Sequence, residues 1–247
     1  MRSLTLLGGR DKTGAPEQLE AIILRPGELY TIVGNTGSGK SRLIKDVEQL
    51  ADGDSVTGRR ILLDEKPVAR AERLSLSAGL IAHLGQNMRF VLDTTVGEFL
   101  ELHANCRGKS PCSSDVLDIA NSITPEPVIL TQNLNLLSGG QARALMIADI
   151  VLLCDSPVVL IDEIENAGID KELALKFLLR QDKLVLVVTH DPHTALMAER
   201  RIVMAGGAVQ KVVARSRDED ALFKTLSAEY QKQKRWQADL RKGVHLA

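Results

Sequence analysis

Three short runs of mainly aliphatic residues occur along the chain, and each is followed by polar or glycine-rich positions. They cover residues 30–33, 158–161 and 184–188. Runs this short and continuous are typical of strands buried on both faces, as in a parallel sheet. Apolar positions at helical spacing lie between them, as in residues 141–153 and 171–180. This alternation predicts an α/β fold with a doubly wound, mostly parallel sheet core.

Three stretches depart from the alternation. Residues 53–70 surround a short apolar run with charges, which predicts a small antiparallel β subdomain. Residues 95–136 are partly helical in pattern and contain several prolines, which predicts a short helical insertion that begins at about residue 87. Residues 218–242 are highly charged and predict a terminal helix. Its expected packing face, at a spacing of four, consists of Leu222, Leu226 and Tyr230.

Composition narrows the class of protein. The 247 residues carry a formal net charge of −1, so we expect no nucleic acid held by bulk electrostatics. Only seven residues are aromatic, which predicts an aliphatic core. No apolar run approaches the roughly 20 residues that cross a bilayer, and the start of the chain does not resemble a signal peptide. We therefore expect a cytoplasmic protein.

The cysteines fit the same compartment. Cys106, Cys112 and Cys154 form no CxxC pair. Cys106 and Cys112 lie close enough in sequence for a disulfide or a metal site, but free thiols in a reducing cytosol are the preferred interpretation. Cys154 lies in an apolar stretch, and we expect it to be a small core residue.

Residues 34–41 match the pattern G-x-x-x-x-G-K-[ST] between an apolar strand and a helical pattern. In that context glycines allow successive backbone N–H groups to converge on phosphate oxygens at a helix N-terminus. Lys40 would neutralise the β- and γ-phosphates, and the Ser41 hydroxyl would ligand Mg²⁺. The predicted nucleotide-binding residues here are Asn35, Thr36, Gly37, Ser38, Gly39, Lys40, Ser41 and Arg42.

Two further segments complete the pattern. The strand at 158–161 ends in Asp162 and Glu163, so the first carboxylate can reach Mg²⁺ and the second can polarise an attacking water. The segment Leu137-Ser138-Gly139-Gly140-Gln141 opens a helix and predicts a second anion-binding site.

With LSGGQ at residues 137–141, the chain resembles the ATP-binding cassette (ABC) ATPases over roughly residues 4–213. The resemblance implies a P-loop NTPase fold of ABC type, with ATP and Mg²⁺ as ligands. It assigns catalysis to Glu163, His190 and Gln86, and metal binding to Ser41, Gln86 and Asp162. It adds Ser138, Gly139, Gly140 and Gln141 to the nucleotide-binding residues.

The same resemblance implies a head-to-tail dimer. ATP would lie between the phosphate loop of one cassette and the Ser138–Gln141 segment of another, in a homodimer or with a similar partner. Closure of the two cassettes on ATP and their opening after hydrolysis would drive movement in a partner protein. A separate membrane-spanning subunit is the preferred partner, with this chain at the inner face of the membrane.

Some features keep other functions open. Ile164 replaces the proline that often follows the catalytic glutamate in transporter cassettes, and Asp162-Glu163-Ile164 looks like the soluble ATPase of iron–sulfur assembly. A soluble assembly or remodelling ATPase with a scaffold partner is therefore the alternative. A regulatory or DNA-associated module is a third class, which the lack of long coiled-coil segments disfavours. Residues 1–29 contain no aromatic residue to stack on adenine, so adenine and guanine both remain open.

The predicted domain organisation is an ATPase domain over residues 1–215 and a charged helical tail over 216–247. Residues 224–242 hold six lysines and arginines against two acidic residues. Such a tail would contact anionic lipid or an acidic partner, or would be a solvated helix packed through its leucine face.

Overall fold

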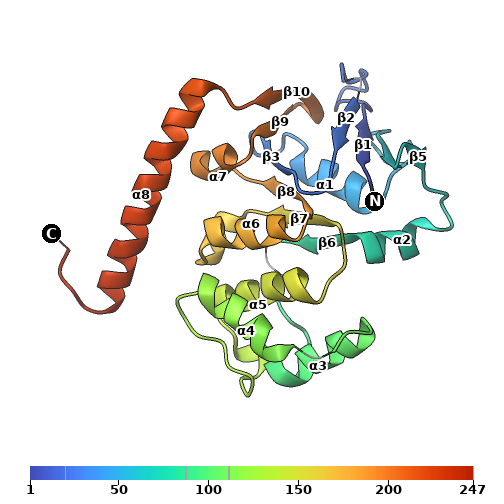
Figure 1. Cartoon of the computed structure of the whole chain (residues 1–247). Helices are drawn as coiled ribbons and strands as arrows, with labels where there is room; N and C mark the ends of the chain where they lie inside the picture. Colours follow the sequence, from blue (N-terminus) through green and yellow to red (C-terminus); the bar gives the residue numbers. More distant parts are fainter. Residues whose placement is uncertain (20, 87, 111, 247) are drawn as a thin grey trace.

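The computed structural model of the chain describes residues 1–19, 21–86, 88–110 and 112–246. Two β-sheets occur in these ranges, and most of the helices lie around the larger one (Figure 1). Asn87, the predicted start of the insertion, Pro111 within it, and Ala247 at the end of the tail lie outside these ranges. The strands are β1 (Leu4–Leu7), β2 (Ala21–Leu24), β3 (Leu29–Val33), β4 (Arg60–Leu63), β5 (Lys66–Pro67), β6 (Ile81–Leu84), β7 (Val158–Asp162), β8 (Leu184–Val188), β9 (Arg200–Ala205) and β10 (Ala208–Ala214). The α-helices are α1 (Lys40–Glu48), α2 (Arg73–Leu80), α3 (Val96–Cys106), α4 (Ser113–Ile123), α5 (Gly139–Leu152), α6 (Lys171–Arg180), α7 (Pro192–Met197) and α8 (Arg217–Arg241).

The larger sheet has the order β10-β9-β3-β8-β7-β6, and all of its strands except β10 run parallel to their neighbours. The three strands predicted from aliphatic runs are β3, β7 and β8, which lie together at its centre. Every residue of β8 is buried, as expected for a strand covered on both faces. Because parallel strands end at the same edge, the segments after β3, β6, β7 and β8 meet there.

The second sheet, of order β2-β1-β4-β5, is antiparallel and contains the β excursion predicted over 53–70. The predicted helical insertion is also present and is formed by α3 and α4, at the bottom of Figure 1. These two helices pack with α5 in a common hydrophobic cluster. Nearly every residue of α5 is buried, including Asp149, so α5 is an interior helix.

The tail is the predicted helix, but one residue of its packing face was predicted wrongly. Leu222 is 50% exposed, while Phe223 stacks on His193 with ring centroids 5.6 Å apart. Leu226 and Tyr230 are half-buried. A strict spacing of four drifts around a helix of 3.6 residues per turn. The half-buried positions Phe223, Leu226 and Tyr230 therefore combine spacings of three and four.

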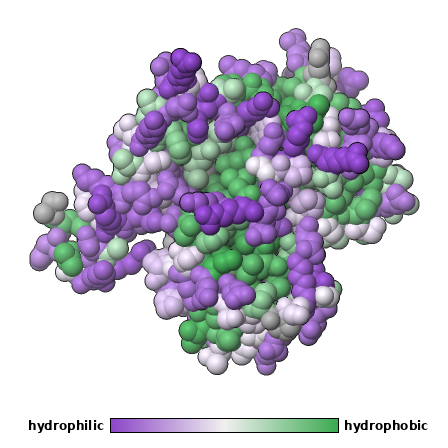
Figure 2. Space-filling model, viewed as in Figure 1, coloured by the Kyte–Doolittle hydropathy of each residue, from purple (hydrophilic) through white to green (hydrophobic). Residues whose placement is uncertain are grey.

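The side of α8 seen in Figure 2 is mainly hydrophilic. In the part of the chain that the structure describes, no helix has the length and apolar character needed to cross a membrane.

Candidate active site

The loop between β3 and α1 is shaped as an anion cradle. Gly39 has φ 105°, and a Cβ atom there would lie 2.9 Å from Gly207 Cα, so only glycine fits. Lys40 Nζ donates hydrogen bonds to the carbonyl oxygens of Gly34, at 2.7 Å, and Asn35, at 3.1 Å. Ser38 Oγ is buried without a hydrogen-bond partner among the described residues. An ammonium held by loop carbonyls and an orphaned hydroxyl are donors suited to phosphate.

Of the other predicted residues in this loop, the exposed ones are Asn35, Thr36, Gly37, Ser41 and Arg42. A second lysine, missed by the sequence analysis, also reaches the loop. Lys12 Nζ donates to the Gly37 carbonyl at 2.7 Å, and the Lys12 backbone N–H donates to the Gly206 carbonyl at 2.9 Å. No pattern in the sequence connects Lys12 with residue 37, because the contact depends on how the segment after β1 folds back.

The acidic residues that follow β7 occupy the same sheet edge. Burial raises the pKa of Asp162, and the neighbouring charge of Glu163 raises it further. Lys40, Arg143 and His83 oppose this increase, so positive charge lies close to the Asp162 carboxylate. Glu163 adopts a left-handed backbone with φ 51°, which is strained for a non-glycine residue and is characteristic of functional sites.

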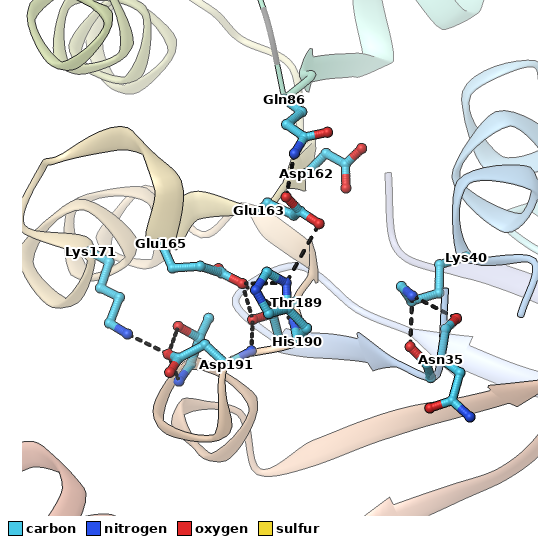
Figure 3. Close-up of polar contacts among 12 residues, drawn as sticks. Asn35, Lys40, Gln86, Asp162, Glu163, Glu165, Lys171, Thr189, His190 and Asp191 are labelled. Carbon is cyan, nitrogen blue, oxygen red and sulfur yellow. Dashed lines mark hydrogen bonds and ion pairs between the residues drawn. The ribbon is translucent and has the colours of Figure 1, made fainter. Parts of the chain in front are cut away.

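Gln86 and His190 converge on Glu163 from the neighbouring strand ends (Figure 3). Gln86 Nε2 donates to Glu163 Oε2, and His190 Nδ1 lies 3.5 Å from Glu163 Oε1. The Glu163 side chain is 25% exposed and that of His190 is 63% exposed, so both are open to a ligand. The structure therefore brings together all three residues predicted to be catalytic.

Glu165 is a further site residue that the sequence analysis missed. Its Oε1 accepts hydrogen bonds from Thr189 Oγ1 at 2.8 Å and from the His190 backbone N–H at 3.3 Å. The same oxygen lies 3.4 Å from His190 Nδ1. Its position two residues after Glu163 was the only signal in the sequence that it belongs to the site. Without the fold, that signal is too weak to assign an acidic residue to the site.

The loop that carries His190 is fixed from the other side by Asp191. Burial alone would raise the pKa of Asp191, but hydrogen bonds from Lys171 and Thr194 outweigh burial and lower it to about 2. Asp191 Oδ2 accepts from the Thr194 backbone N–H at 2.9 Å and so caps α7. Lys171 begins α6, so the His190 loop is tied to the helix that follows Glu165.

Arg143, in the first turn of α5, is buried behind the site. Its guanidinium donates to the carbonyl oxygen of Gly85, just before Gln86, and to that of Asp162 at 2.9 Å. Burial lowers the pKa of Arg143, and the charges of Asp162 and Glu165 oppose this decrease. The sequence analysis gave this residue no role.

The predicted second anion site begins α5 as a capping box. Ser138 Oγ accepts from the Gln141 backbone N–H at 3.3 Å, and Gln141 Oε1 accepts from the Ser138 backbone N–H at 2.9 Å. Ser138 Oγ also donates to Glu126 Oε2 at 2.8 Å. Within the described part of the chain, no hydrogen bond joins this segment to the phosphate loop.

The oxygen donors at the sheet edge fit a magnesium ion. A hydroxyl at Ser41, an amide oxygen at Gln86 and a carboxylate at Asp162 are the hard ligands that Mg²⁺ prefers.

A different cluster within the described residues, formed by His103, Asp149 and Cys154, is a poorer metal candidate. Its imidazole is already used, since Nδ1 pairs with Asp149 at 2.6 Å and Nε2 accepts from Arg107 at 3.2 Å. Cys106, Cys112 and Cys154 are free thiols, as preferred from the sequence, and Cys154 is buried.

Comparison with known proteins identifies this arrangement. A family model described as ABC transporter matches residues 21–166. An uncharacterized ABC transporter ATP-binding protein of Methanocaldococcus jannaschii is 45% identical over 229 residues, which cover 92% of this chain and 88% of the relative.

Solved structures show the same fold. One is a dimeric ATP-binding cassette in a post-hydrolysis state with ADP and Pi, with a TM-score of 0.63 and 24% identity, over 85% of this chain and 98% of that one. Another is CbiO1 of Clostridium perfringens, part of the CbiONQ ABC transporter complex, with a TM-score of 0.63 and 23% identity, over 96% of this chain and 94% of that one. The chain therefore belongs to the ABC transporter family and is an ATP-binding cassette that hydrolyses ATP.

Proposed function

We propose that this chain is the energising subunit of a transporter and works as a head-to-tail pair of cassettes beneath a separate membrane-spanning subunit. The observation that carries the proposal is the convergence of Gln86 and His190 on Glu163, at the edge where the phosphate loop also lies. The Ser138 segment, with no hydrogen bond to that loop in the described chain, is then free to serve the nucleotide held by the other cassette.

In this proposal the side chains at the sheet edge divide the work on ATP among them. Lys40 leaves its carbonyl partners and binds the terminal phosphates of ATP. Ser41, Gln86 and Asp162 hold Mg²⁺, which supplies charge neutralisation at the phosphate oxygens when bound. Glu163 accepts the proton of the attacking water.

Gln86 and His190 act around that carboxylate. The Gln86 amide donates to Glu163 Oε2 and so helps to orient the carboxylate that accepts the proton. His190, exposed beside Glu163, contacts the terminal phosphate.

The membrane partner is supported by the relatives. The Methanocaldococcus relative has the name of a transporter ATP-binding protein, and the CbiO1 structure is part of a transporter complex. The proposed location is accordingly the cytoplasmic side of a membrane. Substrate and direction of transport would be set by the membrane subunit.

A soluble assembly ATPase is the second candidate. Ile164 is fully buried after Glu163, where transporter cassettes often have proline. The described part of the insertion contains only two α-helices, α3 and α4. A small insertion offers less surface for a membrane subunit. No role with nucleic acid is proposed.

The test is purification of the Glu163→Gln protein with ATP from detergent-solubilised membranes of its own cells, with Lys40→Ala as the matched control that should not hold nucleotide. A stoichiometric multi-spanning partner that also stimulates wild-type ATP hydrolysis in vesicles supports the transporter. A soluble metalloprotein or scaffold that stimulates hydrolysis in its place contradicts it and supports the second candidate.

A further inference from the structure

Two buried polar atoms of opposite character lie behind the His190 loop without partners. Arg143 Nε and Glu165 Oε2 are both fully enclosed and have no hydrogen-bond partner among the described residues. Arg143 is 6% exposed and the Glu165 side chain is 11% exposed. A buried donor or acceptor without a partner destabilises the fold, so an atom left in this state is expected to have a partner in another conformation.

The two side chains also carry opposite charges and interact electrostatically. Glu165 is one of the two carboxylates that stabilise the charged form of Arg143, although the described structure contains no direct ion pair between them. The guanidinium is held in place through its other two nitrogens by Gly85 and Asp162. Nε is the one guanidinium nitrogen of Arg143 that donates to no described residue, so it is available to a carboxylate.

The other oxygen of Glu165 is committed to the histidine loop. It accepts from the Thr189 hydroxyl and the His190 backbone N–H, and it lies beside His190 Nδ1 (Figure 3). One carboxylate therefore faces the histidine through Oε1 and leaves Oε2 buried without a partner.

We propose that Glu165 is a positioning residue for His190, and that Arg143 is the buried counter-charge through which the Ser138 helix α5 acts on it. When α5 moves as the cassettes close, Arg143 Nε engages Glu165 Oε2. This contact locks the Thr189–His190 loop in its working position. Contact of the Ser138 segment with nucleotide is thereby transmitted to the switch histidine of the same chain.

This inference rests on the proposed role of His190, and a double-mutant cycle tests both. Steady-state ATP hydrolysis is measured over a range of ATP concentrations, with ATP in excess over enzyme, for Glu165→Gln, Arg143→Met, His190→Ala and the doubles with His190→Ala. Glu165→Gln keeps the shape of the side chain and loses only its charge. Lys183→Met is the matched control, because Lys183 is also a buried cation and its bonds go to the carbonyls of Cys154 and Ser156.

The expected result is a loss of about 10- to 100-fold in kcat for Glu165→Gln and Arg143→Met, with KM for ATP within about twofold of wild type. Neither change should lower the rate further once His190 is alanine, because both act through that residue. Arg143→Lys, which keeps the charge, should retain more activity than Arg143→Met. Lys183→Met should have wild-type kcat.

Two outcomes overturn the inference alone. In one, His190→Ala lowers kcat and Glu165→Gln does not. In the other, the double variant loses kcat by the product of the two single losses. A wild-type rate for His190→Ala would instead refute the proposed role of His190, and the inference with it.

The proposed action of Arg143 on the histidine loop can also be tested without measuring ATP turnover. In protein labelled with ¹⁵N-histidine, Arg143→Met should shift the His190 backbone amide signal, although none of the bonds that Arg143 makes in the structure goes to His190. An unmoved signal in folded, nucleotide-bound Arg143→Met protein contradicts the link between α5 and the histidine loop.

Discussion

Ser138 donates its hydroxyl hydrogen to the Glu126 carboxylate across 2.8 Å, which places a negative charge at the N-terminus of α5. The positive end of the helix dipole favours an anion there, and Glu126 provides one from within the chain. In the proposed dimer, the terminal phosphate of ATP would have to compete with this carboxylate. In that dimer, the contact between Ser138 and Glu126 would therefore oppose closure of the two cassettes on ATP.

Glu126→Gln should consequently favour the ATP-bound dimer. The amide keeps a hydrogen-bonding group near Ser138 and removes the charge. The ATP concentration needed for half-maximal dimerisation should fall about two- to fivefold, the range expected for one charge at a helix end. Analytical ultracentrifugation in a Glu163→Gln background measures this midpoint of dimerisation.

Glu101→Gln, at an exposed position of α3, is the control and should leave the midpoint unchanged. Weaker dimerisation of Glu126→Gln would show that the carboxylate assists closure.

Glu163→Gln should bind ATP and fail to hydrolyse it. The amide cannot accept the proton of the attacking water, while the phosphate contacts of Lys40 are intact. We expect a loss of about 100- to 10,000-fold in kcat, the usual contribution of a general base. Light scattering after gel filtration should then detect an ATP-dependent dimer. A protein that remains monomeric at saturating Mg-ATP would contradict the paired-cassette proposal.

Lys12→Ala should weaken nucleotide binding even though Lys12 lies far outside the glycine-rich motif. Its ammonium adds positive charge to the phosphate loop and holds the loop through the Gly37 carbonyl. We expect Kd for ATP to rise about three- to tenfold, or roughly 1 kcal/mol, because one charged hydrogen bond at an exposed position is lost.

Isothermal titration calorimetry measures the Lys12 effect against two references. Lys40→Ala should weaken binding more than Lys12→Ala, because Lys40 meets the terminal phosphates directly. Lys211→Ala, on the exposed side of β10, should leave Kd unchanged. Equal affinities for wild type and Lys12→Ala would limit Lys12 to a structural contact.

The sequence predicts those parts of the site that follow buried strands. Glu163 and His190 each follow one of the predicted strands, whereas Gln86 follows no predicted strand and was assigned only through the resemblance to the ABC ATPases. The parallel sheet brings the carboxyl ends of its strands together at one edge. Lys12 and Arg143 could not be assigned in this way. Lys12 reaches its partner through an irregular loop, and Arg143 depends on the burial of a whole helix, which local spacing does not reveal. Leu222 was misplaced for a related reason, because four-residue spacing drifts from the buried face of α8.

Asp191 gives a prediction for the dependence of stability on pH. Its folded-state pKa of about 2 lies below the ordinary value of 3.8, so its carboxylate stabilises the fold fully above about pH 4. As the pH falls from about 4 towards 2, Asp191 becomes protonated and this contribution is lost. Asp191→Asn should therefore unfold at a lower urea concentration than wild type at pH 7, and the difference should shrink when both are measured at pH 3. Asp118→Asn, at an exposed position of α4, should show no such pH-dependent difference. A gap between wild type and Asp191→Asn that is as large at pH 3 as at pH 7 would mean that the bonds from Lys171 and Thr194 do not depend on the Asp191 charge.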